Sequence, residues 1–89
     1  MGDLDEARDS FRKALDLDPG NIAALTNLAD YYCRRRKWAE AEVLLRKAIE
    51  FEPENPQWYI NLGKFYDLIG RRGEADEAYS RAEALKKNR

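Results

Sequence analysis

The chain repeats itself with a period of 34 residues, and this period constrains the fold more than any other feature of the sequence. Shifting the sequence by one period superposes alanine, large apolar, proline and asparagine positions. The matched positions are Ala7, Ala41 and Ala75; Phe11, Leu45 and Tyr79; Ala14, Ala48 and Ala82; Pro19 and Pro53; Asn21 and Asn55; Asn27 and Asn61; Leu28 and Leu62; and Tyr32 and Tyr66. A fixed period of roughly 20–50 residues is typical of solenoids and related repeat architectures.

Each period contains two amphipathic helices. Its apolar residues follow, in two separate stretches, the i, i+3, i+4, i+7 spacing that places side chains on one face of an α-helix. The first stretch holds Leu25, Leu28, Ala29 and Tyr32, and one period later Tyr59, Leu62, Gly63 and Tyr66. The second holds Ala41, Leu44, Leu45 and Ala48, and then Ala75, Ala78, Tyr79 and Ala82. The small residue of the first stretch, Ala29 or Gly63, would let a neighbouring helix approach closely.

Helix boundaries are marked by residues with defined end preferences. Asn21 and Asn55 suit the N-cap position, and Pro56 stands at a helix start, where its missing N–H costs nothing. Gly70 is placed to end a helix in the left-handed conformation. We therefore expect an all-α fold with five helices, at about residues 3–17, 22–35, 38–52, 56–69 and 73–87.

Two full runs and one partial run carry a family resemblance. They are Asn27-Leu28-Ala29 with Tyr32, Ala41, Leu45, Ala48 and Pro53; Trp58-Tyr59-Ile60-Asn61-Leu62-Gly63 with Tyr66, Gly70, Ala75, Tyr79 and Ala82; and Gly2-Asp3-Leu4-Asp5-Glu6-Ala7 with Phe11, Ala14, Asp18 and Pro19. These runs resemble the tetratricopeptide repeat, or TPR, over nearly the whole chain. The resemblance implies a TPR-like α-solenoid of about two and a half helix-turn-helix repeats.

The repeats divide one expected domain, residues 1–89, into three parts. Residues 1–20 match the second helix of a partial repeat, and residues 21–54 and 55–89 each match a full repeat. No polar helix of the kind that usually caps such arrays follows the last repeat. We therefore expect the chain to be an excerpt of a longer array. The alternative is that apolar residues of its open end pair with another copy of the chain; these residues are Leu4, Phe11 and Leu15.

The resemblance also implies a binding surface. In TPR proteins the first helix of each repeat lines a concave groove that accepts extended peptides or partner helices. The corresponding residues here are Thr26, Asn27, Asp30, Cys33 and Arg34, and then Gln57, Ile60, Asn61, Lys64 and Asp67. Their charges have both signs and largely cancel. We therefore expect a protein or peptide partner, without a preference for an acidic or a basic one.

Asn27 and Asn61 are the strongest candidates within this set. An asparagine amide offers both a donor and an acceptor, which matches a peptide backbone without reading its side chains. Two such amides, one repeat apart, could hold an extended chain. The alternative interpretation is that each asparagine only bonds a neighbouring carbonyl and stabilises the fold.

Recognition of a chaperone C-terminus is disfavoured. TPR domains of that kind hold the terminal carboxylate with a clamp of Lys, Asn and Arg. Asn27 could correspond to one clamp asparagine, but Gln57 and Asn61 stand where the third repeat would supply its Lys and Arg. The helix that would supply the remaining two clamp residues is missing.

Charge and composition exclude several other functions. Sixteen Lys and Arg nearly balance 17 Asp and Glu, so nothing draws the chain toward nucleic acid or an anionic membrane. The basic run at residues 34–37 lies at a helix C-terminus, where cations favour the helix dipole. The less favoured alternative is that this run contacts an anion or an acidic partner. Histidine is absent and no catalytic motif is present, so we expect no enzyme activity, no cofactor and no metal. The single cysteine, Cys33, suggests a reducing, cytoplasmic location.

Four large aromatic residues could form a stacking platform. They are Tyr31, Trp38, Trp58 and Tyr59. At helical spacing within this repeat such residues more often belong to the core or to the seam between two helices. Tyr31 lies outside the predicted apolar stripes and is expected to be the most exposed of the four.

Overall fold

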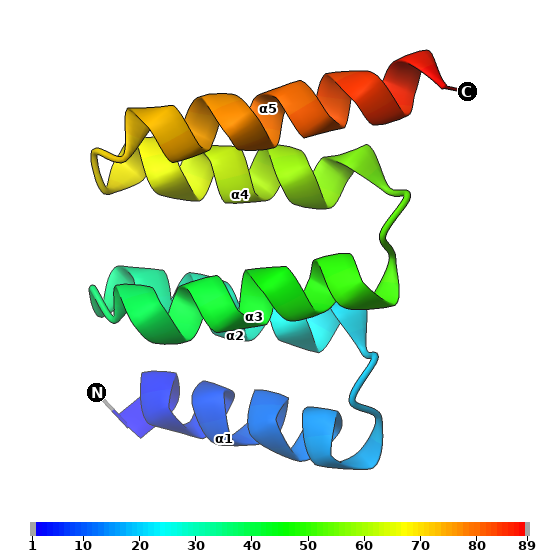
Figure 1. Cartoon of the computed structure of the whole chain (residues 1–89). Coiled ribbons are helices and arrows are strands. Elements are labelled where there is room, and N and C mark those ends of the chain that lie inside the picture. Colours follow the sequence, from blue (N-terminus) through cyan, green and yellow to red (C-terminus); the bar gives the residue numbers. More distant parts are fainter. Residues whose placement is uncertain (1, 89) are drawn as a thin grey trace. The chain divides into compact units, whose positions relative to one another are not determined.

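Five α-helices make up the part of the chain that the structure describes. The computed structural model describes the backbone of residues 2–88 and the side chains of residues 6–88. The helices are α1 (Gly2–Leu17), α2 (Ile22–Arg34), α3 (Trp38–Phe51), α4 (Pro56–Leu68) and α5 (Arg72–Lys87), and residues 2–88 contain no strand (Figure 1). The all-α fold is confirmed, and every helix end lies within one residue of its predicted place.

The chain forms two compact units, Met1–Ala48 and Ile49–Arg89. The first holds α1, α2 and most of α3, and the second holds the end of α3 with α4 and α5. Each unit is described by itself. The assignment of residues 1–89 to a single domain, and the repeat boundaries inside it, stay predictions.

Asparagine caps begin α2 and α4, as the sequence predicts. The Asn21 side chain accepts a hydrogen bond from the backbone N–H of Ala24 at 3.1 Å. The Asn55 side chain accepts one from the backbone N–H of Gln57 at 3.0 Å, and Pro56 follows at the helix start. Each cap satisfies one of the N–H groups that a helix start leaves without a partner inside the helix.

The turns that follow α2 and α4 have the same hydrogen-bond pattern. In the first, Lys37 N–H donates to the carbonyl oxygen of Tyr32 at 2.9 Å, and one period later Arg71 N–H donates to Tyr66 at 2.8 Å. Both turns require a positive φ at one residue, which is 59° at Arg36 and 81° at Gly70. Gly70 therefore ends α4 in the predicted left-handed conformation, while the equivalent position carries an arginine.

In the first unit, the buried face of α2 is wider than one apolar stripe. Six residues of α2 are buried: Ala24, Leu25, Leu28, Ala29, Tyr31 and Tyr32. The prediction that Tyr31 is exposed is wrong, because only 7% of its surface is accessible. Its ring meets the Tyr32 ring edge to face, with centroids 5.4 Å apart, and the Arg35 guanidinium lies over it at 5.4 Å. Ala24 and Tyr31 lie on the same side of the helix as Leu28. The buried face of α2 therefore extends beyond the predicted stripe on this side.

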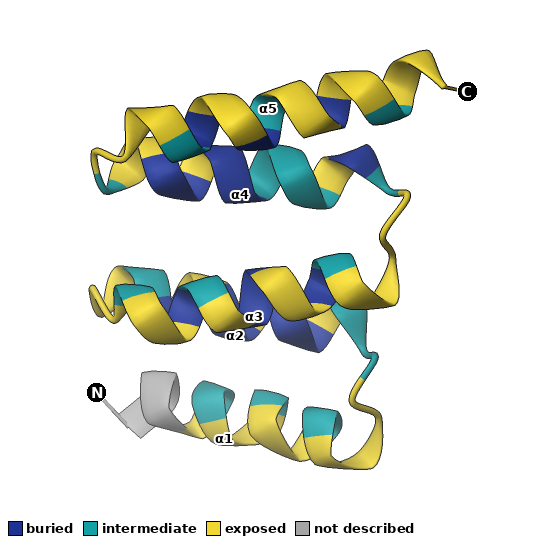
Figure 2. Ribbon diagram, viewed as in Figure 1, coloured by how far each residue is buried: buried dark blue, intermediate teal, exposed yellow. Residues whose placement is uncertain are grey.

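In the second unit, α4 and α5 lie side by side and antiparallel (Figure 1). Figure 2 shows buried positions along both helices where they adjoin. The buried residues are Pro56, Leu62, Gly63, Phe65 and Tyr66 of α4 and Ala75, Ala78 and Ala82 of α5. A Cβ added to Gly63 would lie 2.7 Å from the Tyr79 ring, so glycine is what permits this close approach. The predicted role of Gly63 is thus confirmed.

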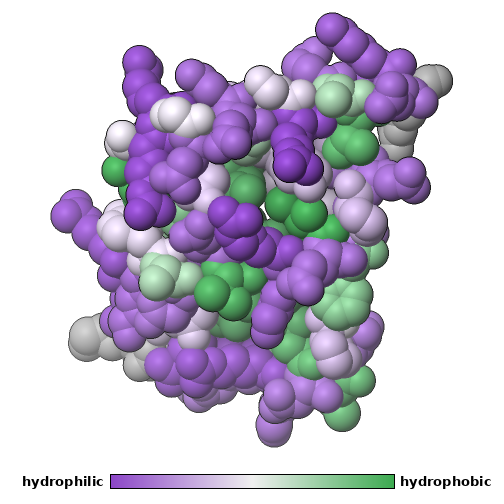
Figure 3. All heavy atoms as spheres, viewed as in Figure 1, coloured by the Kyte–Doolittle hydropathy of each residue, from purple (hydrophilic) through white to green (hydrophobic). Residues whose placement is uncertain are grey.

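The outward side of α5 is polar. Figure 3 shows hydrophilic side chains over most of this helix, and Glu77, Ser80 and Glu83 are exposed. No helix within residues 2–88 has the length and apolar character that a membrane-spanning segment needs.

Candidate functional site

The exposed side of α2 carries Asn27, Asp30 and Arg34. Arg34 Nε donates to Asp30 Oδ2 at 3.0 Å, one helical turn away, so the two charges largely neutralise each other. Thr26 is half-buried, and its hydroxyl lies within hydrogen-bond distance of the carbonyl oxygens of Ile22 and Ala23 in its own helix. Its donor is therefore already used. Asn27 is left as the neutral, exposed hydrogen-bonding group of this side.

Cys33 is half-buried at the end of α2. Burial raises the pKa of its thiol, and the negative charge of Asp30 raises it further. A raised pKa keeps the thiol protonated near neutral pH, whereas a reactive cysteine needs the thiolate. Cys33 is therefore a small, weakly polar residue at the end of α2 rather than a nucleophile.

On α4, Gln57 and Asn61 form a pair. Gln57 Nε2 donates to Asn61 Oδ1 at 3.0 Å, from one helical turn earlier. Gln57 is exposed, and Asn61 and Ile60 are half-buried. Because this bond uses the Asn61 oxygen, it directs the two N–H donors of the Asn61 amide toward other acceptors.

Lys64 and Asp67 are the charged candidates of α4, and both are exposed. The Tyr79 hydroxyl of α5 donates to Asp67 Oδ2 at 3.1 Å. Desolvation, together with the hydrogen bond to Asp67 and its charge, raises the pKa of Tyr79, so this hydroxyl keeps its proton. This hydrogen bond links Asp67 to α5. Lys64 is the positively charged residue among the candidates of α4.

The structure brings the candidate residues together only within each unit. Those of α2 belong to the first unit and those of α4 to the second. That the two sets form one groove stays a prediction, as do their roles in binding.

The residues expected to support self-association are in α1. Phe11 and Leu15 are half-buried, and the side chain of Leu4 lies outside the described residues. Sequence reasoning missed Leu17, which is 88% exposed. The period contained the signal, because a large apolar residue recurs in the last turns of the second helices as Leu17, Phe51 and Leu85.

Comparisons with known proteins identify the family. Two sequence profiles, both described as the tetratricopeptide repeat, match residues 1–59 and residues 57–89. The chain belongs to the tetratricopeptide repeat family. TPR proteins form a non-enzymatic scaffold family, which supports a role in protein interaction.

Two solved structures show how far the likeness extends. The first TPR of Spaghetti (RPAP3), bound to the HSP90 peptide SRMEEVD, is 32% identical with a TM-score of 0.78; the match covers 99% of this chain and 70% of that one. MamA is 22% identical with a TM-score of 0.55; the match covers 97% of this chain and 70% of that one. The MamA likeness concerns the fold alone. A comparison with curated proteins finds no match.

Proposed function

We propose that this TPR protein binds an extended segment of a partner protein by its backbone, with Asn27 and Asn61 as the principal contacts. The observation that carries the proposal is their shared position, one period apart on the first helices of the two repeats. Neither residue caps its helix, since Asn21 and Asn55 have that role. Asn27 is exposed and Asn61 is half-buried, and neither amide serves as the cap of its helix.

The two amides offer different hydrogen bonds. Asn61 accepts from Gln57 and so keeps its N–H donors for a ligand carbonyl. The residue of α2 that corresponds to Gln57 is Ala23, which has no polar side chain. Asn27 can therefore both donate to a carbonyl and accept from an N–H, as an extended backbone requires.

Ligand charge has a minor part in this proposal. Asp30 is paired with Arg34, and Asp67 accepts from Tyr79. Lys64 is the exposed cation that remains, so an acidic side chain near it adds a small preference. Because neutral amides provide the main contacts, we expect the affinity to change little with added salt.

A peptide-library screen tests the proposal. The wild-type chain and an Asn27→Ala/Asn61→Ala variant are screened side by side under identical conditions. We expect the wild type to enrich a set of peptides that the variant does not. Equal enrichment by both proteins, or none by the wild type, would overturn backbone binding by these asparagines.

The peptide SRMEEVD is a useful probe in the same assay, because the RPAP3 domain binds it. Its acidic residues and terminal carboxylate suit a positively charged clamp, whereas Gln57 and Asn61 are neutral. We expect this chain to bind SRMEEVD more weakly than the peptides enriched in the screen. Tight binding that weakens steeply with salt would show that a charged clamp exists here after all.

Self-association through α1 is the second candidate function, and the exposure of Leu17 favours it. An apolar side chain that is 88% accessible gains free energy when a partner covers it. Sedimentation over a range of concentrations tests the idea, with Leu17→Glu and Phe11→Glu as variants checked for helix content. A mass that stays monomeric at every concentration would exclude self-association.

A further inference from the structure

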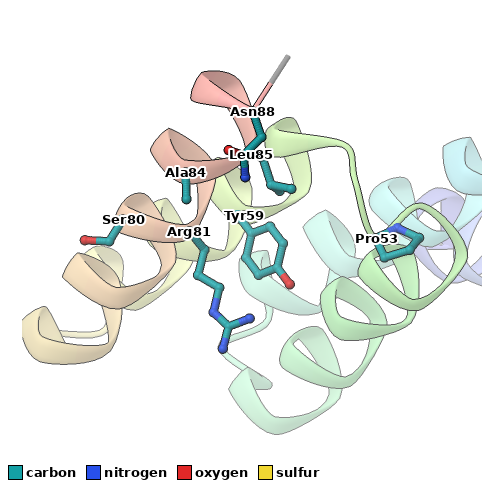
Figure 4. Close-up of a pocket in the computed structure, with 7 residues that line it drawn as sticks. All are labelled: Pro53, Tyr59, Ser80, Arg81, Ala84, Leu85 and Asn88. Atoms are coloured by element: carbon teal, nitrogen blue, oxygen red, sulfur yellow. The ribbon is translucent and has the colours of Figure 1, made fainter.

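The second unit contains a pocket that none of the predicted site residues lines. It has a volume of about 450 Å³, and its walls come from the turn before α4, from α4 and from α5 (Figure 4). Pro53, Tyr59 and Leu85 supply apolar surface, and Arg81 and Asn88 supply polar groups. In Figure 4 the side chains of Tyr59 and Arg81 extend to the same side of their helices, while the Ser80 hydroxyl points away from Tyr59.

The pocket and the candidate peptide-binding residues lie on opposite sides of α4. Tyr59 is two residues from Gln57 and two residues from Asn61. At 3.6 residues per turn, a step of two residues turns the side chain by about 200°. A ligand held against Tyr59 therefore leaves Gln57 and Asn61 uncovered.

Arg81 gives the pocket its chemical character. It is the charged residue among those that line the pocket, and it is exposed. Within residues 6–88 its guanidinium has no hydrogen bond or ion pair. Glu77, one turn earlier on α5, does not line the pocket.

Comparison with the preceding repeat shows what is special about this place. One period before Arg81 the chain has Lys47, followed by Glu50 and Glu54. At the positions of those two acids, the later repeat has Ala84 and Asn88. The cation is thus kept while both nearby carboxylates are lost, and the pocket carries a positive charge next to apolar walls.

We propose that this pocket is a second binding site, for an acidic segment of a partner protein. An apolar side chain of the ligand packs against Tyr59, Leu85 and Pro53, and an adjacent carboxylate pairs with the Arg81 guanidinium. The Asn88 amide adds a neutral hydrogen bond at the rim. Arginine suits this contact because its planar guanidinium can donate two parallel hydrogen bonds to one carboxylate.

The test is an NMR titration of the full chain with two blocked hexapeptides. One is Gly-Ser-Leu-Glu-Ser-Gly, and the other has glutamine in place of glutamate. We expect the glutamate peptide to shift the backbone amide signals around Tyr59 and Leu85, and to bind about 1.5-fold to fivefold more tightly than its analogue. Its binding also weakens as salt is added.

Matched variants assign the effect to Arg81. Arg81→Gln and Arg72→Gln each remove one positive charge from an exposed position of α5. We expect Arg81→Gln to abolish the preference for glutamate and Arg72→Gln to retain it. If both variants lost the preference for glutamate equally, the preference would come from the net charge of the protein and the role of Arg81 would be contradicted. If the wild type showed no saturable shifts, the binding site itself would be overturned.

The same titration on Asn27→Ala/Asn61→Ala separates this site from the proposed peptide-binding function. We expect the double variant to bind the glutamate peptide as the wild type does. Loss of binding in the double variant would mean that the peptide uses the asparagine side of α4, and would contradict the pocket.

Discussion

Gly63 makes room for the Tyr79 ring between α4 and α5. A methyl group at this position would lie 2.7–2.8 Å from three ring carbons, so the ring would have to move away from Gly63. We expect Gly63→Ala to lower the free energy of unfolding by about 1–2 kcal/mol, because the overpacking outweighs the better helix propensity of alanine.

Gly73→Ala is the matched control. It lies in the first turn of α5, and no atom stands within 4 Å of an added Cβ. We expect this change to be neutral or to add up to about 0.5 kcal/mol through helix propensity. Urea denaturation of both variants measures the difference, and equal stabilities would contradict the close packing at Gly63.

The reactivity of Cys33 reports the environment at the end of α2. Because burial and the Asp30 charge raise the pKa of the thiol, less thiolate is present at about pH 8 than in an unfolded cysteine peptide. We expect modification by a disulfide reagent to accelerate on unfolding. In the folded protein, Asp30→Asn should accelerate the modification by less than about threefold, because solvent screens the exposed carboxylate of Asp30. A rate that levels off below about pH 8 would show a lowered pKa instead.

The turns after α2 and α4 differ at one equivalent residue, Arg36 or Gly70. Both have positive φ, which costs a residue with a Cβ roughly 1–2 kcal/mol and costs glycine almost nothing. We expect Arg36→Gly to raise the unfolding free energy by about 0.5–1 kcal/mol, and Gly70→Arg to lower it by about 1–2 kcal/mol. Thermal denaturation of the two variants tests this; changes of the same sign would contradict the assignment.

The caps of α2 and α4 predict which asparagines serve the fold. Asn21→Ala and Asn55→Ala each remove the side-chain acceptor of a helix-start N–H. We expect each to lower stability by about 1 kcal/mol. Asn27→Ala, on the exposed side of α2, should leave stability unchanged or slightly raised. Chemical denaturation distinguishes them, and a large loss for Asn27→Ala would assign that residue to the fold instead of to ligand binding.

The helices were predictable from sequence because their ends carry strong local signals. Asparagine caps, Pro56 and Gly70 each act within one turn, and the period repeats the asparagine cap at Asn21 and Asn55. The burial of Tyr31 was missed because a single apolar stripe was assumed for α2. The equivalent residue one period later is Phe65, which is also buried. Its ring meets the Tyr66 ring edge to face, with the ring centroids 5.5 Å apart. Comparing these two positions would have predicted the wider buried face.

The candidate site was less predictable than the fold. The period identifies the surface residues of α2 and α4, but it does not show which of their side chains form hydrogen bonds or ion pairs with each other. The Asp30–Arg34 and Gln57–Asn61 pairs depend on side-chain rotamers, which sequence spacing permits without determining. The pocket at Arg81 required residues from α4, α5 and the preceding turn to be placed together. Family membership gives the scaffold role, while the partner depends on these individual side chains.

Calorimetric titration of a peptide from the screen tests the proposed backbone recognition most directly. The peptide is titrated into the wild type, Asn27→Ala, Asn61→Ala and the double variant. We expect each single change to weaken binding by about twofold to tenfold and the double change by about fivefold to a hundredfold, as for the loss of one or two hydrogen bonds. Equal affinity in the wild type and the double variant would contradict peptide recognition by the asparagines of α2 and α4.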